Sequence, residues 1–279
     1  MRPGGFSMLP VVVKNLLILN GLFFLATIVL SSNYGINLIN ILGLHFPIAE
    51  EFKIYQVITY MFMHGDFRHI LFNMFAVWMF GSVLENYWGA KRFITYYIIT
   101  GIGAAVIHYL VVYYDMYPTL AHLKAFNNDP SPEALNAFIN SDNFKISTHQ
   151  MLSNFKDFKN NYNQLLAEGQ VNEALNVSLQ FMADYKVDFL NQPVVVGASG
   201  SLFGLLLAYG MLFPNALIYL FFAIPIKAKY FVILYGAFEL YSGFANYGTS
   251  NIAHFAHLGG MLFGYFLIKW WQKNEFRQY

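Results

Sequence analysis

Apolar residues in this chain gather into long runs separated by polar segments. The first run, residues 11–31, could be a secretory signal, but no small-residue cleavage pattern follows it and similar runs come after it. We interpret it as a retained membrane span, because a span needs about 20 mostly apolar residues. A run at residues 216–226 is too short to cross and contains Pro225, so we expect it at the membrane interface. Together the longer runs predict six spans, at residues 11–31, 67–87, 92–114, 196–213, 229–244 and 252–271.

Two polar segments divide these spans into groups. Residues 32–66 are semi-polar and join the first two spans, whereas residues 115–192 form a water-soluble insertion between the third and fourth. Residues 1–114 therefore carry the first three spans, and residues 193–279 carry the last three. We expect an all-α membrane protein with six transmembrane helices and an extramembrane insertion.

The insertion has the sequence signals of helices. Ser131, Pro132 and Glu133 are typical of an N-cap, a first-turn proline and an early acid. Residues 144–166 and 171–190 have apolar positions at helical spacing. No catalytic motif lies in this segment, so we predict a helical insertion that does not carry the chemistry.

The charges predict an orientation. On one side of the predicted membrane, the short connections and both termini hold nine basic and two acidic residues. The other side holds seven basic and twelve acidic residues, and Glu239 is left inside the fifth span. Cytoplasmic connections retain Lys and Arg, so we expect both termini in the cytoplasm.

Composition excludes several classes of protein. Hydrophobic residues make up 57% of the chain and charged residues 11%, about half the charged share of a soluble domain, which favours a lipid environment. The basic residues are dispersed and the net charge is +1, which argues against nucleic acid as a partner. The absence of cysteine excludes disulfides, a thiolate zinc site and cysteine catalysis.

The first candidate for chemistry is Gly197-Ala198-Ser199-Gly200 at the start of the fourth span. Gly200 and Gly204 also form a small-xxx-small pair, which commonly just lets membrane helices approach each other. On these residues alone, helix packing is the better explanation. Catalysis needs a second group near Ser199.

A second candidate is the sequence AHLGG at residues 256–260 of the sixth span. At about 100° per residue, His257, Gly260 and Gly264 share one helical face, so the imidazole points toward a closely packed neighbour. A histidine inside a membrane is costly and usually functional. The alternative is a neutral imidazole satisfied by a backbone carbonyl.

Ser199 and His257 are predicted at similar depths below the outer face. Two closely packed helices could therefore bring the hydroxyl within hydrogen-bond reach of an imidazole base, which a serine nucleophile requires. Phe203, one turn below Ser199, could stack on the imidazole and orient it. No Asp lies in any predicted span to act as a third triad member.

His69 and Asn73 lie four residues apart at the outer end of the second span and share a helical face. Two donors at the depth of a nucleophile predict an oxyanion site, completed by the backbone N–H of Ser199. A polar patch at the membrane interface is the alternative.

Other mechanisms lack their residues. His254 and His257 could chelate a metal, but the last two spans add only Glu239 as a further ligand, and no HExxH motif occurs. Paired intramembrane Asp residues are also missing. We assign His64 and His108 structural roles, and we expect no metal and no cofactor.

These motifs together resemble the rhomboid family of intramembrane serine proteases. The likeness covers most of the chain outside the insertion. It rests on HGDFRHILFNMF at residues 64–75, ENYWGAKRF at 85–93, GASGSLFG at 197–204 and AHLGGMLFG at 256–264.

The resemblance implies a six-helix bundle in which Ser199 and His257 form a catalytic dyad in a water-filled cavity open to the outside. It places His69 and Asn73 at the oxyanion positions, and we count Gly197, Gly200 and Phe203 as supporting residues. Residues 32–66 would lie sideways in the outer leaflet. This chain has Tyr55-Gln56 where many members have Trp-Arg, which puts the anchoring of that loop in doubt.

We therefore expect hydrolysis of peptide bonds in or near transmembrane segments of other membrane proteins, through an acyl-enzyme on Ser199. The expected partners are these substrates and the lipid bilayer. A rhomboid-like protein that binds membrane segments without cleaving them is the alternative. A small-solute transporter fits less well, because matching broken helices are absent. The lack of a transit peptide favours a bacterial inner membrane.

Overall fold

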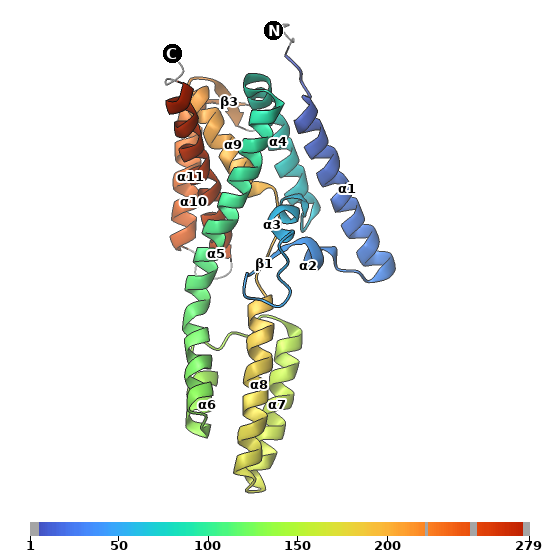
Figure 1. Ribbon diagram of the computed structural model, residues 1–279, viewed down its shortest axis with the longest axis vertical. Helices are drawn as coiled ribbons and strands as arrows, with labels where there is room; N and C mark the ends of the chain where they lie inside the picture. The colour runs from blue at the N-terminus through green and yellow to red at the C-terminus, as the bar shows by residue number, and fades with distance from the viewer. Residues whose placement is uncertain (1–5, 221–222, 246–249, 276–279) are drawn as a thin grey trace. The chain divides into compact units, whose positions relative to one another are not determined.

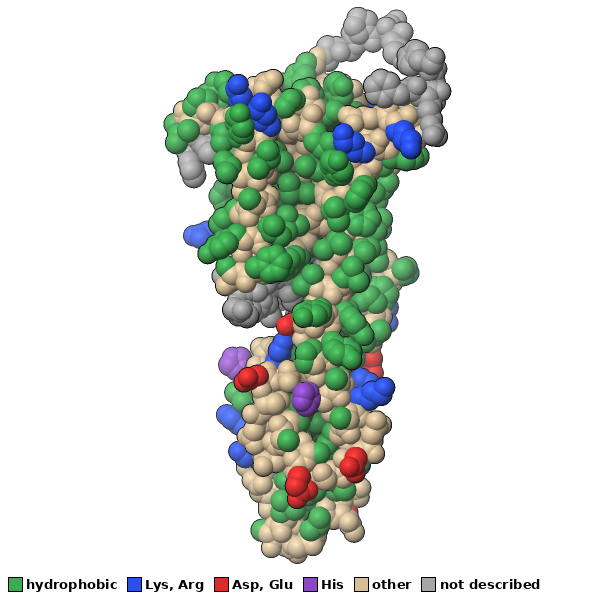
Figure 2. Space-filling model, turned by 90° about the vertical axis from the view of Figure 1, so that its left-hand side faces the viewer, with side chains coloured by type: hydrophobic (Ala, Val, Ile, Leu, Met, Phe, Trp, Pro, Cys, Tyr) green, Lys and Arg blue, Asp and Glu red, His purple; other side chains and the backbone are tan. Residues whose placement is uncertain are grey.

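The computed structural model describes residues 6–220, 223–245 and 250–275, and it divides the chain into two compact units (Figure 1). The first unit comprises residues 1–44, 53–111 and 195–279. The second comprises residues 45–52 and 112–194. On the face that Figure 2 shows, apolar side chains cover much of the first unit, where Lys and Arg gather near one end, whereas both acidic and basic side chains are scattered over the second unit.

Long helices dominate the first unit. Their bounds are α1 Val11–Tyr34, α4 Phe67–Trp88, α9 Ser199–Leu212, α10 Ala228–Ala245 and α11 Ser250–Glu275, and α5, Ala90–Asn128, begins here. Short elements complete the chain before α4: α2 Leu38–Leu42, β1 Leu44–His45, α3 Gln56–Thr59 and the 3-10 helix η1 Tyr60–Phe62.

Three of these helices, α1, α4 and α5, are long and apolar enough to cross a membrane. They contain the first three predicted spans. Helix α9 is apolar but has only 14 residues, about 21 Å at the rise of an α-helix. Helix α10 carries Lys229 and Glu239, which lower its mean hydropathy. The structure therefore bears out a mostly helical fold with three candidate spans.

Close contacts hold the helices of the first unit together. Helix α9 packs against α4, α10 and α11. It is also joined to α5, because the Tyr96 hydroxyl donates to the Gly204 carbonyl oxygen at 2.9 Å. The buried Glu85 of α4 accepts the backbone N–H groups of Val12 and Val13 at 3.0 and 2.8 Å. A carboxylate at the N-terminus of α1 satisfies donors that have no acceptor within that helix.

The short apolar run at residues 216–226 forms an antiparallel hairpin. Its strands are β3 Leu217–Leu220 and β4 Ile224–Lys227, and Ile218 pairs with Ile226. Pro225, opposite Tyr219, has no N–H to donate, which suits the edge position of a two-stranded sheet. Two strands of the run thus pair with each other, and its position at the membrane interface stays a prediction.

The second unit is helical, as the spacing of apolar residues predicts. Its helices are α6 Pro132–Ile139, α7 His149–Ala167 and α8 Val171–Asn191, and β2, Val194–Val195, pairs with β1. The predicted N-cap is confirmed, since the Ser131 side chain accepts from Ala134 N–H and Pro132 is the first residue of α6. Helix α7 starts later than predicted because Thr148 caps it. The core of the second unit includes the stacked rings of Phe158 and Phe181, whose centroids are 4.1 Å apart.

Helix α5 does not end where the third predicted span ends. It continues past Tyr114 to Asn128, with Pro118 inside it. The proline removes one backbone donor and the helix tolerates it, so the first part of the predicted insertion is a direct extension of this helix.

Candidate active site

Ser199 is the first residue of α9, where backbone N–H groups have no acceptor within the helix. The preceding loop is held by a hydrogen bond of 2.9 Å from Gly197 N–H to the Tyr60 carbonyl oxygen. Gly197 has a φ of 123°, and a Cβ there would lie 2.7 Å from Nε2 of His69. Both the backbone angle and the close approach therefore require glycine immediately before the serine turn.

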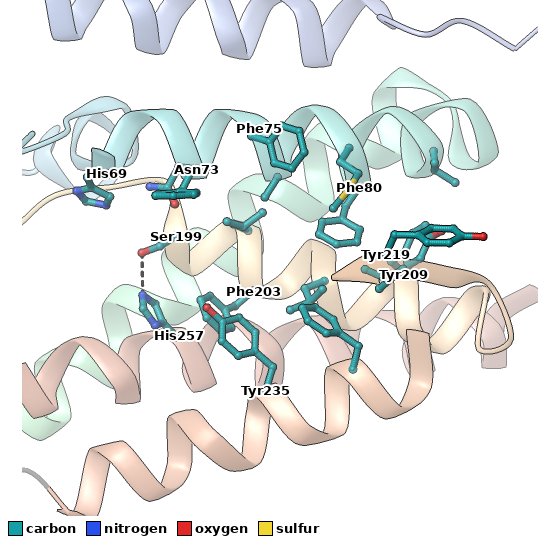
Figure 3. Close-up of a pocket in the computed structure, with 18 of the residues that line it drawn as sticks. His69, Asn73, Phe75, Phe80, Ser199, Phe203, Tyr209, Tyr219, Tyr235 and His257 are labelled. Atoms are coloured by element: carbon teal, nitrogen blue, oxygen red, sulfur yellow. Dashed lines mark hydrogen bonds between the residues drawn. The ribbon is translucent and has the colours of Figure 1, made fainter. Parts of the chain in front are cut away.

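His257 reaches Ser199 from α11. Its Nε2 lies 3.0 Å from Ser199 Oγ, and Figure 3 shows the two side chains facing each other. Phe203, one turn along α9, stacks on the imidazole at a centroid distance of 4.2 Å and an angle of 7°. A hydroxyl that donates to an imidazole nitrogen, with a ring behind the imidazole, is the geometry needed to activate a serine.

Glycines bring the two helices this close. A Cβ on Gly260 would overlap the carbonyl oxygen of Gly200, and a Cβ on Gly200 would overlap the Ala104 side chain of α5. The predicted small-residue packing face and the predicted Ser–His pair therefore occur together. Close packing of the glycines places the Ser199 hydroxyl beside the His257 imidazole. Helix packing and catalysis are therefore not alternative explanations of the glycine and serine motif.

Helix α4 brings His69 and Asn73 to the same end of the site. Asp66 caps this helix by accepting His69 N–H at 2.9 Å. Asn73 is buried, and its Nδ2 lies 3.1 Å from Nε2 of His64. In Figure 3, Ser199 lies between Asn73 and His257. Both side chains predicted to bind an oxyanion thus line the same cavity as Ser199.

His64, for which we predicted only a structural role, contacts both side chains of the predicted oxyanion site. Its ring packs edge-on against His69 at 4.8 Å, and its Nε2 accepts from the Asn73 amide. Burial lowers the pKa of His64 to about 4, which keeps the ring neutral and able to accept. His64 therefore orients the Asn73 amide. The motif HGDFRH contains this histidine, but its spacing from Asn73 does not by itself reveal the contact.

The lowered pKa of His64 predicts a dependence of stability on pH. Between pH 6.5 and about 4, the unfolded chain binds a proton at His64 that the folded protein does not bind. The free energy of unfolding should therefore fall as the pH falls, by at most about 1.4 kcal/mol per pH unit. Melting temperatures over this range should decline less steeply in His64→Gln than in the wild type. His149→Gln, at an exposed position, is the control. If melting temperature falls with pH equally steeply in the wild type and in His64→Gln, His64 does not have the lowered pKa in the folded protein.

Glu239 was missed as a site residue. It is a buried residue of α10, and its Oε2 lies 2.9 Å from Nδ1 of His257 and 2.7 Å from Nδ1 of His254. From the sequence, Glu239 is predicted only as a possible metal ligand, because a third triad member was expected to be an Asp inside a span. The available signal was an acidic residue inside a predicted span, which by default indicates function.

Among the described residues, Glu239, His254 and His257 also form a group that could hold a metal ion, since one ligand atom from each lies within 4.8 Å of the others. The same contacts serve equally as hydrogen bonds between a carboxylate and two imidazoles.

The reactive groups lie at one end of a cavity of about 790 Å³. Helices α4, α9, α10 and α11 and strand β3 line it, mostly with apolar side chains. Figure 3 shows His69, Asn73, Ser199 and His257 together at one end, with Tyr209 and Tyr219 toward the other. The site therefore combines a polar reaction centre with a long apolar groove. The apolar lining includes Phe72, Phe75, Met79, Phe80, Leu206 and Phe231.

Similarity to known proteins agrees with the sequence motifs. The family model described as the Rhomboid domain matches residues 51–121 and 173–272. Rhomboid-like protein 15 of Arabidopsis thaliana is 34% identical over 64 residues, which cover 23% of this chain and 16% of the relative. Rhomboid-like protein 11, chloroplastic, from the same plant is 33% identical over 58 residues, which cover 21% of each chain. The chain thus spans about a fifth of the length of these curated relatives. No solved structure matches it.

Proposed function

The chain belongs to the rhomboid family, and from this premise we propose that it is an intramembrane serine protease. It would hydrolyse peptide bonds in or near transmembrane segments of other membrane proteins. One observation carries the proposal: Ser199 Oγ lies 3.0 Å from His257 Nε2 at the polar end of an apolar cavity.

In the proposed reaction, Ser199 Oγ attacks the carbonyl carbon of the substrate while its proton passes to His257 Nε2. The C–N bond then breaks, the leaving amine takes that proton, and an ester joins the acyl group to Ser199. His257 next takes a proton from water as the water oxygen attacks the ester carbonyl carbon. The bond between that carbon and Ser199 Oγ then breaks, the acyl group leaves as a carboxylic acid, and His257 returns the proton to Ser199 Oγ. All of these steps use groups of this chain and water, so the proposal requires no cofactor.

Three donors would stabilise the oxyanion of the tetrahedral intermediate. They are the Asn73 amide, a ring N–H of His69 and the backbone N–H of Ser199 at the start of α9. Donors held in place before the reaction stabilise developing charge more than solvent does, because they need not reorganise. Capping of α4 by Asp66 and the contact between His64 and Asn73 support such a fixed arrangement.

We further propose that α9, α10 and α11 complete a six-span bundle with α1, α4 and α5, and that both termini are cytoplasmic. The charge distribution supports this orientation, although Arg2 and Arg277 lie outside the described residues. The family and the three apolar helices make the chain an integral membrane protein. The matched relatives are plant proteins and do not support the bacterial inner membrane expected from the sequence.

A serine-reactive probe tests the function directly. Protein purified in detergent should react with a fluorophosphonate, and mass spectrometry should locate the label on Ser199. It should also cleave a reconstituted reporter that contains a transmembrane segment. Failure of the folded protein to react or cleave would overturn the protease assignment and favour a protein that binds membrane segments without cleaving them.

The oxyanion assignment makes a separate prediction. Asn73→Ala should keep Ser199 in place yet slow cleavage by roughly 10² to 10³, the usual cost of losing one such donor. The cleavage rate of the reporter should be measured beside Asn20→Ala, which removes another buried amide from a predicted span, in α1. Wild-type cleavage by folded Asn73→Ala would show that His69 and the Ser199 amide suffice.

A further inference from the structure

Glu239 is an acidic side chain in an apolar helix and is only 3% exposed. Burying a carboxylate is costly unless charged or hydrogen-bonding groups compensate it. Its Oε2 accepts hydrogen bonds from Nδ1 of His254 at 2.7 Å and Nδ1 of His257 at 2.9 Å. Of these, the contact with His257 bears directly on the proposed reaction.

A hydrogen bond at one ring nitrogen of histidine fixes the state of the other. If Nδ1 of His257 donates to the carboxylate, Nε2 carries the lone pair. Nε2 is the atom that lies 3.0 Å from Ser199 Oγ. The contact with Glu239 therefore selects the tautomer that can take the serine proton.

The contact distances are those of hydrogen bonds. Glu239 Oε2 lies 2.7 Å from Nδ1 of His254 and 2.9 Å from Nδ1 of His257. Both separations fall within the ordinary range for N–H···O hydrogen bonds.

We propose that Glu239 is a positioning residue of the reaction and completes a Ser199–His257–Glu239 triad whose acid comes from α10. This inference rests on the proposed protease function and adds a third member to the serine–histidine dyad. The carboxylate holds Nδ1–H of His257 and stabilises the imidazolium that forms when Nε2 takes the proton from Ser199. Phe203 fixes the plane of the same ring by stacking, so the imidazole is held both at its face and at its edge.

His254 has a secondary part in this arrangement. It donates to the same oxygen of Glu239 but does not line the reaction cavity. Its side chain is 22% exposed, against 4% for that of Glu239. His254 therefore helps to hold the carboxylate, and its loss should matter less than loss of the carboxylate itself.

Three variants test the proposal. Glu239→Gln keeps the shape but loses the charge, and it should lower both fluorophosphonate labelling and reporter cleavage by about 10⁴, the size of the loss that removal of the acid produces in other triads. Glu239→Asp restores the charge and should recover part of that loss. His254→Gln should cost less than about tenfold. Melting temperatures in the same detergent show whether each variant is folded.

A spectroscopic measurement tests the tautomer of His257 in the wild type itself. Nitrogen NMR of ¹⁵N-histidine-labelled wild type, with His257→Gln used to assign the signal, reports which ring nitrogen of His257 carries the proton. We expect protonation at Nδ1. A proton on Nε2 in the wild type would overturn the proposal.

The outcomes separate this inference from the protease assignment. If Ser199 is labelled in the wild type but Glu239→Gln reacts at the same rate, the triad is wrong and the protease assignment stands. If the folded wild type is neither labelled nor active, the protease assignment fails and the role of Glu239 in catalysis fails with it. Rescue by Glu239→Asp, with Nδ1 protonated in the wild type, would support the triad.

Discussion

Ser199→Ala should abolish cleavage while leaving the melting temperature nearly unchanged. Loss of the nucleophile of a serine protease lowers the rate by about 10⁶, because the remaining groups cannot form the acyl-enzyme. The substitution removes one oxygen atom from a half-buried position beside Gly200. Among the described residues its cross-helix hydrogen bond is with His257, and such bonds in membranes contribute only about 0.6 kcal/mol on average.

Ser201→Ala is the matched control, two residues along the same helix. Its hydroxyl is buried and donates to the Tyr97 carbonyl oxygen at 2.8 Å, away from the reaction centre. This variant should lose a little stability and keep its activity, the reverse of Ser199→Ala. Reporter cleavage and melting temperature should be measured on both variants in one detergent. Residual cleavage by Ser199→Ala, with contaminating proteases excluded, would end the proposal of a serine nucleophile.

Gly260→Ala should damage both stability and activity. The new methyl group would overlap the carbonyl oxygen of Gly200 and come within 2.9 Å of the carbonyl carbon. These are backbone atoms and cannot rotate away, so α9 and α11 must separate. Overpacking of a close interface typically costs 1 to 3 kcal/mol, and separation of the helices would also pull His257 away from Ser199. We expect a lower melting temperature and loss of most labelling at Ser199.

Gly21→Ala provides the control for a glycine in a membrane helix. Gly21 lies inside α1, and a Cβ there would meet no atom within 4 Å. Alanine is a better helix former than glycine, so this variant should be as stable as the wild type or more stable. If Gly260→Ala melts and reacts like Gly21→Ala, close contact of α9 and α11 does not hold the reaction centre together.

The helices and the serine–histidine pair could be predicted because their signals are local. Apolar runs of sufficient length indicate helices, and Ser199 and His257 lie in short motifs with glycines on one face. The supporting position of Phe203 also followed from spacing, since it lies one helical turn from the nucleophile. Each of these features depends on a few consecutive residues and on the fixed geometry of a helix.

Features that depend on contacts between distant segments could not be predicted in the same way. Glu239 lies 18 residues from His257 along the chain, and only the packing of α10 on α11 brings them together. His64 contacts Asn73 because the loop before α4 folds back on that helix. The pairing of β3 with β4 was also missed, since an apolar run of that length has no periodicity that separates a strand from a short helix.

The apolar lining of the cavity has a consequence for how activity is assayed. Lipid tails are as apolar as the groove, so a substrate segment that leaves the bilayer gains little from hydrophobic transfer. Acyl chains of lipid or detergent are therefore rival occupants of the space between Ser199 and Tyr219. For a protease with this groove, the apparent Michaelis constant should vary with the chain length and concentration of the detergent, whereas the turnover number at saturating substrate should not. Comparisons between variants are then meaningful only in one amphiphile at one concentration.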